Sequence, residues 1–112
     1  MDKNIPAKKW DKLSFVQQMA NIGSEAERAM SWKKQERQQY FWNSLCRTLD
    51  LINLTIGDEK NINQLRELTR IKELWLDLVV GKNEYRQSDE TWKKYFHPFY
   101  IKARKKLSRY VD

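Results

Sequence analysis

The sequence predicts an all-α protein: a four-helix bundle with a basic N-terminal arm and a C-terminal helix kinked by proline. Apolar residues recur at the helical period in four separate segments of the chain. Only three Gly and two Pro residues are present, which leaves few turn signals for a fold of many strands. Hydrophobic residues make up 40% of the 112 residues, a composition that suits one domain with one modest core.

The predicted arm covers residues 1–12, and the predicted single bundle domain covers residues 13–112. The arm has four Lys residues and two Asp residues, and Pro6 opposes a helix that runs through that point. Trp10 is the residue that we expect to attach the arm to the helical body.

The first long helix is expected to begin after Ser14. Ser14 and Gln17 have the spacing of a capping box, in which each side chain binds the backbone of the other residue. The apolar stripe of this helix runs as far as Met30, and Gly23 and Ala26 lie on it. Because Gly inside a helix costs about 1 kcal/mol relative to Ala, these small residues indicate a neighbouring helix that packs closely.

A turn is predicted within residues 31–35, although the apolar phase also permits one continuous helix through residues 31–37. A continuous helix from the residue after Ser14 to Ile56 would be about 60 Å long at 1.5 Å per residue. Such a helix is long for a domain of this size. The second helix is therefore expected to be separate from the first and to end before Gly57.

The most strongly amphipathic segment is residues 61–80. Its apolar arc is wide enough to contact two neighbouring helices, so this helix is expected to be central in the fold. Asn61 is expected to cap its start, with Gln64 at the third helical position, and Gly81 is expected to end it.

The last helix follows a loop at residues 81–87 and is expected to be capped by Ser88. Pro98 interrupts it, so the helix either kinks there or stops at His97 and restarts. Five residues at helical spacing form its expected core face: Trp92, Phe96, Phe99, Ala103 and Leu107.

A second line of residues runs along the back of the main apolar face of the second helix, spaced four and three residues apart. A helix in a small bundle usually needs only one apolar stripe. Either the fold itself covers this line or a second copy of the chain does. The expected oligomer interface consists of Tyr40, Arg47, Leu51 and Leu54.

The net charge of +7 is concentrated near the C-terminus. Residues 91–112 contain seven basic side chains and one acidic side chain, whereas residues 1–90 contain 15 and 14. Such a local excess indicates an anionic partner, and cations interleaved with aromatics are typical of contacts to phosphates and unpaired bases. An acidic membrane surface, an acidic protein partner, or a plain solvated helix end would also explain it. The expected nucleic-acid-binding residues are Lys93, Lys94, Tyr100, Lys102, Arg104, Lys105, Lys106, Arg109 and Tyr110.

Patterns for catalysis, metals and cofactors are largely missing from the sequence. It has one His and one Cys, with no cluster that suits zinc and no Gly-rich phosphate loop. Cys46 is expected to pack as a small hydrophobic residue. We therefore expect a protein that is not an enzyme and uses no cofactor, with a nuclease that depends on His97 as the weakest alternative.

The sequence also bears on location. The first ten residues have no apolar signal segment, and the most apolar run is short and broken by Asp77. The single Cys excludes an intramolecular disulfide. We expect a cytoplasmic protein that does not insert into membranes.

Three stretches, FVQQMANIGSEAERA, RELTRIKELWLDLVVGKNEY and KKYFHPFYIKAR, resemble a recurrent group of small bacterial helical proteins. The resemblance covers most of the chain and implies neither an activity nor site residues. In architecture alone, a small basic four-helix bundle is similar to the accessory variability determinant proteins, which assist reverse transcriptases in diversity-generating retroelements. The leading hypothesis is an accessory protein that binds RNA or single-stranded DNA within a larger complex. The architectural likeness implies that this complex contains a reverse transcriptase. The alternative is a self-associating protein-interaction module.

Overall fold

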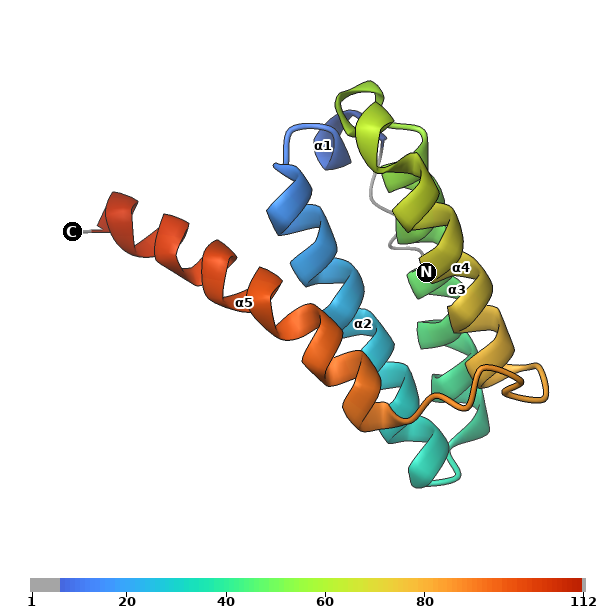
Figure 1. The fold of residues 1–112 in the computed structure, drawn as a ribbon. Coiled ribbons are helices and arrows are strands. Elements are labelled where there is room, and N and C mark those ends of the chain that lie inside the picture. Colours follow the sequence, from blue (N-terminus) through green and yellow to red (C-terminus); the bar gives the residue numbers. More distant parts are fainter. Residues whose placement is uncertain (1–6, 112) are drawn as a thin grey trace.

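The computed structural model describes the backbone of residues 7–111 and the side chains of residues 7–105. The described residues form helices and no strands, which confirms the predicted all-α class. In chain order the elements are α1 (Ala7–Trp10), α2 (Phe15–Lys34), α3 (Gln38–Ile56), the 3-10 helix η1 (Glu59–Gln64), α4 (Leu65–Val79) and α5 (Asp89–Val111) (Figure 1).

Helix α2 is the centre of the packing. It packs against α3 on one side and against α5 on another, and α3 in turn packs against α4. Figure 1 shows α2, α3 and α4 side by side, whereas the C-terminal part of α5 leads away from α2. The prediction that the segment at residues 61–80 is central is therefore wrong, because α2 rather than this segment packs extensively against two long helices.

The capping signals of the sequence are confirmed at two helix starts. The Ser14 Oγ accepts a hydrogen bond from the Gln17 backbone N at 3.1 Å, and the Gln17 Oε1 accepts one from the Ser14 backbone N at 2.9 Å. At the start of α5, the Ser88 Oγ accepts a hydrogen bond from the Thr91 backbone N at 3.2 Å. Helix α3 ends directly before Gly57, as predicted.

The turn between α2 and α3 exists but lies later than predicted. Helix α2 continues to Lys34, and the chain turns through residues 35–37, where Glu36 has a φ of 57°. The helix continues because Met30 is buried and the Trp32 ring packs 4.9 Å from the Tyr40 ring of α3. The alternative of one continuous helix is wrong.

The start of the fourth helix also differs from the prediction. Residues 59–64 form η1, which is capped by the Asp58 carboxylate through the Lys60 backbone N at 3.2 Å. Asn61 does not cap α4. Its buried side-chain Nδ2 donates to the Gln18 Oε1 at 2.8 Å and to the Thr55 carbonyl oxygen at 3.0 Å. Both acceptors belong to other helices, so the Asn61 side-chain nitrogen is held inside the fold and does not cap α4.

Trp10 attaches the N-terminal segment to the helical body, as predicted. Its side chain is fully buried, and its Nε1 donates a hydrogen bond to the Thr55 Oγ1 at 2.9 Å. The Trp10 carbonyl oxygen accepts a hydrogen bond from the Gln18 Nε2 at 3.0 Å. The arm nevertheless includes regular structure, because α1 begins at Ala7. Residues 1–6 of the predicted arm lie outside the described residues.

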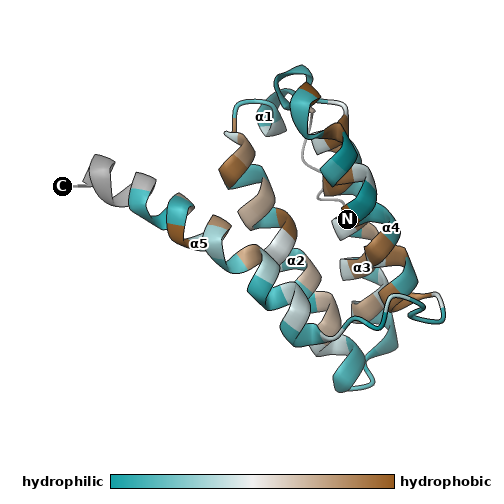
Figure 2. Cartoon of the chain, in the orientation of Figure 1, coloured by the Kyte–Doolittle hydropathy of each residue, from teal (hydrophilic) through white to brown (hydrophobic). Residues whose placement is uncertain are grey.

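Helix α5 runs through Pro98 without ending, so the alternative of a stop at His97 is wrong. Trp92 and Phe96 are buried on its inner face, and Phe99 and Ala103 are half-buried beyond them. The side chain of Leu107 lies outside the described residues. Figure 2 shows apolar residues concentrated on α2, α3 and α4 and mainly hydrophilic residues along the part of α5 that leaves the body.

The small residue Gly23 determines how closely α5 approaches α2. A Cβ atom built at Gly23 would lie 2.7 Å from the Phe96 Cγ and 2.5 Å from the Tyr100 Oη. These separations are far below ordinary carbon contact distances of about 3.5–4.0 Å. The neighbour that the small residues of the first helix predicted is therefore α5.

Replacing Gly23 by Ala is expected to destabilise the protein, although Ala favours a helix. Phe96 is fully buried and its ring cannot move without disturbing the core, so overpacking should cost about 1–3 kcal/mol. Chemical denaturation followed by circular dichroism measures this change. Asn21, which is exposed on the same helix and bonds the Gln17 carbonyl oxygen of that helix, provides the control, since Asn21→Ala should change the free energy of unfolding by only about 0.5 kcal/mol. A stabilised Gly23→Ala variant would contradict the close approach of α5.

Candidate nucleic-acid interface

Five of the seven cations predicted to bind nucleic acid lie exposed on α5. The buried residues Trp92 and Phe96 define the inner face of this helix, and at about 100° per residue the cations occupy the opposite and flanking faces. The acidic residues of α5 are Asp89 and Glu90 in its first turn, and residues 91–111 contain no acidic side chain that would offset the positive charge along the rest of the helix. We call the five exposed cations the α5 basic face: Lys93, Lys94, Lys102, Arg104 and Lys105.

The side chains of the other two predicted cations and of one aromatic lie outside the described residues. These are Lys106, Arg109 and Tyr110. Their places in the sequence continue the same helix towards its C-terminus.

Tyr100, also predicted to contact nucleic acid, lies at the contact between α5 and α2. Its side chain is half-buried, and its hydroxyl donates a hydrogen bond to the Glu27 Oε2 at 2.6 Å. Burial and the adjacent Glu27 carboxylate raise the pKa of Tyr100, so the hydroxyl remains a donor. The structure therefore gives Tyr100 a bracing contact between two helices, whereas base stacking would need an open ring face.

Acidic residues border the α5 basic face at its start and on the side that faces α2. The Asp89 Oδ2 lies 3.0 Å from the Lys34 Nζ, which ties the start of α5 to the end of α2. Arg104 lines a shallow hollow together with Glu27 and Tyr100. Lys102 and Lys105 are exposed on the flank away from Glu27, so they are the members best placed to meet an anionic partner.

His97 and Cys46 are both exposed, on α5 and α3 respectively. The prediction that Cys46 packs as a small hydrophobic residue is wrong, because its place on α3 falls outside the arc that faces the core. His97 lines a shallow hollow on α5 together with Lys93 and Lys94. Among the described residues, no group of three or more His, Cys, Asp or Glu side chains is placed to hold a metal ion.

The four residues predicted to form an oligomer interface do not share one exposed surface. Tyr40 is 52% exposed, but Leu51 is 6% exposed and belongs to the core. Leu54 is half-buried against that core. Arg47 is half-buried, with its Nη1 3.7 Å from the Glu25 Oε1 of α2. The protomer itself therefore covers most of this line, which is the other alternative that the pattern allowed.

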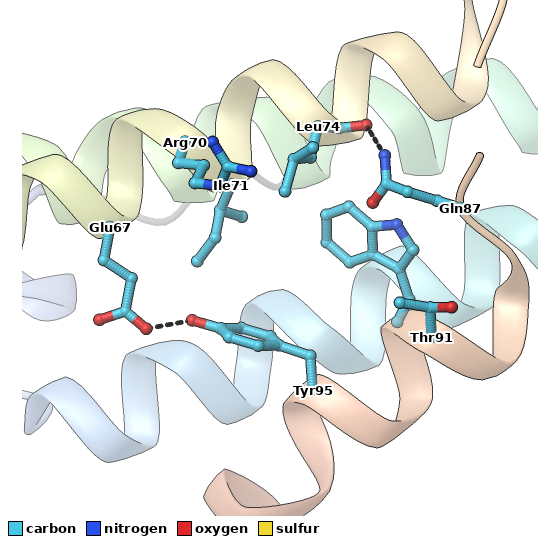
Figure 3. Close-up of a pocket in the computed structure, with 8 residues that line it drawn as sticks. Glu67, Arg70, Ile71, Leu74, Gln87, Thr91 and Tyr95 are labelled. Carbon is cyan, nitrogen blue, oxygen red and sulfur yellow. Dashed lines mark hydrogen bonds between the residues drawn. The ribbon is translucent and has the colours of Figure 1, made fainter. Parts of the chain in front are cut away.

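A pocket between α4 and α5 was not predicted from the sequence. Its volume is about 230 Å³, and apolar side chains such as Ile71 and Trp92 supply most of its wall. At one end the Tyr95 hydroxyl donates a hydrogen bond to the Glu67 Oε2, and burial together with that carboxylate raises the pKa of Tyr95. At the other end the Gln87 Nε2 donates to the Leu74 carbonyl oxygen at 3.0 Å (Figure 3).

The wide apolar arc of residues 61–80 is the sequence signal that relates to this pocket. That arc predicted two neighbours for the helix, and the structure provides α3 as one and α5 as the other. The α4–α5 contact is made through side chains such as Trp75 and Trp92, whose ring centroids lie 5.3 Å apart. The rest of this seam is left open as the pocket.

The chain matches no protein-family model, and neither the curated proteins nor the solved structures contain a significant match to it. Fold and site together define an all-α protein whose last helix carries an exposed basic face. Across the described part of the chain, none of the helices has the combination of length and apolar character needed to cross a membrane.

Proposed function

We propose that this protein binds single-stranded RNA or DNA through the α5 basic face, as a non-enzymatic accessory component of a larger complex. In this proposal the four long helices act as a four-helix bundle that holds α5 in place. Nucleic-acid phosphates are neutralised by Lys and Arg side chains that project into solvent, and such contacts supply most of the sequence-independent affinity.

The observation that carries this proposal is the exposure of five cations on one helix that leads away from the body. Lys93, Lys94, Lys102, Arg104 and Lys105 are all exposed, and the C-terminal part of α5 is separated from α2 in Figure 1. A strand could therefore approach α5 from several sides.

A membrane surface suits this helix less well than a strand of phosphates. Helices that lie on membranes insert a broad apolar face between the lipids. The large apolar residues Trp92 and Phe96 of α5 are buried in the body, and Ile101 is the exposed large hydrophobic residue among its described side chains, at 39% exposure.

Affinity for single-stranded oligonucleotides measured at several salt concentrations tests this proposal. Neutralising phosphates releases counterions, so the logarithm of the association constant should fall linearly with the logarithm of salt concentration, with a slope of about −0.7 for each phosphate contact. Five contacts would give a slope of about −3.5. A protein that binds neither RNA nor DNA at about 50 mM salt, where such contacts are strongest, would refute the proposal.

The second candidate function is self-association as a protein-interaction module. The observation in its favour is Tyr40, which is 52% exposed and packs against the half-buried ring of Trp32. Analytical ultracentrifugation over a wide concentration range tests it. A wild-type monomer at the highest concentration would exclude self-association, and a dimer that dissociates on Tyr40→Ala would support it.

A further inference from the structure

We propose that His97 is a further phosphate-binding residue of the α5 basic face, and that it joins this face only when its imidazole is protonated. The protein would then hold nucleic acid more tightly in mildly acidic solution. This inference rests on the proposed function, since it names another contact residue on the same surface and the condition that controls it. His97 is the only His in the sequence, and its side chain is exposed on α5.

The cations of the α5 basic face fall into two groups with a gap between them. Lys93 and Lys94 form the first group, and Lys102 begins the second. Residues 95–101 contain no Lys or Arg, and Lys94 and Lys102 are about 12 Å apart along the helix axis at 1.5 Å per residue. An anionic strand that contacts both groups must therefore cross about two helical turns that carry no permanent positive charge.

His97 lies in this gap, on the same side of α5 as the cations. At about 100° per residue, it lies within about 60° of both Lys94 and Arg104 around the helix axis. The aromatic residues of the gap are buried or half-buried, and the exposed residues Pro98 and Ile101 have no side-chain donor. His97 is thus the residue of the gap that can present a positive charge on the outer face.

The charged groups around His97 couple its proton to a bound anion. His97 lines the shallow hollow on α5 with Lys93 and Lys94, one turn earlier, and with Glu90 at the start of the helix. The residues that line this hollow all come from residues 88–98, so its charged side chains belong to α5 itself. Like charges one turn apart on a helix repel each other. A phosphate bound over His97 would offset this repulsion, so the proton and the strand should favour each other's binding.

The sign of the pH dependence follows from the chemistry of the imidazole. An ordinary His side chain gains its proton as the pH falls through about 6.5, and the protonated ring has two N–H donors where the neutral ring has one. Lys and Arg side chains keep their charge throughout this range. Lowering the pH should therefore add one phosphate contact to those of the five cations.

Affinity for oligothymidylate and oligouridylate at about pH 8 and about pH 5.5, the range in which His titrates, tests this inference. The bases of these strands do not titrate in this range, so a change in affinity reports on the protein. One additional exposed ion pair should strengthen binding by the wild type about two- to fivefold at the lower pH. The salt slope should become steeper by about 0.7. Equal affinity and equal slope at both values would overturn the inference and leave the proposed function in place.

Two variants assign the pH dependence to the position of His97. His97→Lys carries a positive charge at both values of pH, so its affinity should not change between them. The exchange variant, His97→Asn with Asn53→His, keeps the composition and moves the imidazole to an exposed position on α3. His and Asn have similar helix propensities, so the exchange variant should match the wild type in circular dichroism. Its affinity should no longer depend on pH. A pH dependence that persists in it would mean that net charge is responsible, and would overturn the inference.

A probe without bases separates failure of this inference from failure of the proposed function. Long-chain inorganic polyphosphate offers a row of phosphates, and the Cε1–H proton resonance of the single imidazole reports its protonation by NMR. By linkage, a two- to fivefold gain in affinity corresponds to a rise of about 0.3–0.7 in the pH at which the ring is half-protonated. Polyphosphate should cause this rise in the wild type and not in the exchange variant.

The outcomes of the polyphosphate titration are distinct. An unchanged midpoint for His97 would overturn the inference even if strands bind to the protein. A raised midpoint without binding of either strand would support the phosphate site at His97 and refute the proposed function.

Discussion

Replacing Leu51 by Asp is expected to unfold the protein. Leu51 is 6% exposed and lies in the core cluster, on the side of α3 that packs against α2. An Asp side chain is too short to reach solvent from this position, and the nearby Arg47 already contacts Glu25. An unpaired buried carboxylate should cost about 4 kcal/mol or more, a large share of the roughly 5–15 kcal/mol that stabilises a typical domain.

Circular dichroism and urea denaturation of the Leu51→Asp variant measure this effect. Tyr40→Asp is the matched control, because Tyr40 lies on the same line of α3 and is 52% exposed, so it should cost no more than about 1 kcal/mol. A Leu51→Asp variant that stays helical but has half the native mass would contradict the structure. It would show that a second copy of the chain, rather than α2, covers Leu51.

The contrast between Leu51 and Tyr40 shows what a pattern of residues can and cannot predict. Helical spacing shows that the two residues share a face of α3, because that relation depends only on the helical period. It does not show what covers the face. Whether a residue of α3 is buried depends on where α2 packs against it. The position of α2 relative to α3 depends in turn on the turn at Glu36, which lies later in the chain than the sequence indicated.

Local signals predicted the helix starts well. The capping box of Ser14 and Gln17 and the cap at Ser88 need only residues within three positions, so the sequence contains all the information. Asn61 has the same residue type as a cap, but its partners lie on α2 and α3, 43 and six positions away. A rule based on neighbours in sequence cannot see such partners.

The candidate sites follow the same division. The exposure of cations such as Lys102 follows from the helical phase of α5 once Trp92 and Phe96 are assigned to the core. The role of Tyr100 depends on Glu27, which lies 73 positions away in the chain. The pocket could not be predicted because it is the space left where α4 and α5 do not pack fully, and no residue pattern records such a space.

Reversing two charges on the α5 basic face is expected to weaken nucleic-acid binding at least about tenfold, or about 1.4 kcal/mol. Lys102 and Lys105 are the best pair, because both are exposed and occupy neighbouring positions one turn apart on the flank away from Glu27. Lys102→Glu with Lys105→Glu removes two phosphate contacts and adds repulsion. The salt dependence should therefore also become shallower, by about 1.4 units of slope for a single strand.

The control for this variant reverses the same number of charges on a different helix, α1. Lys8 and Lys9 are adjacent and exposed on α1, so Lys8→Glu with Lys9→Glu gives the same net charge as the α5 variant. If phosphates bind the α5 basic face, the control should keep a slope close to that of the wild type, because its cations make no contacts. Equal losses of affinity and of slope in both variants would mean that net charge alone attracts the strand. Circular dichroism of both variants should match the wild type, since the four replaced side chains are exposed and lie outside the core.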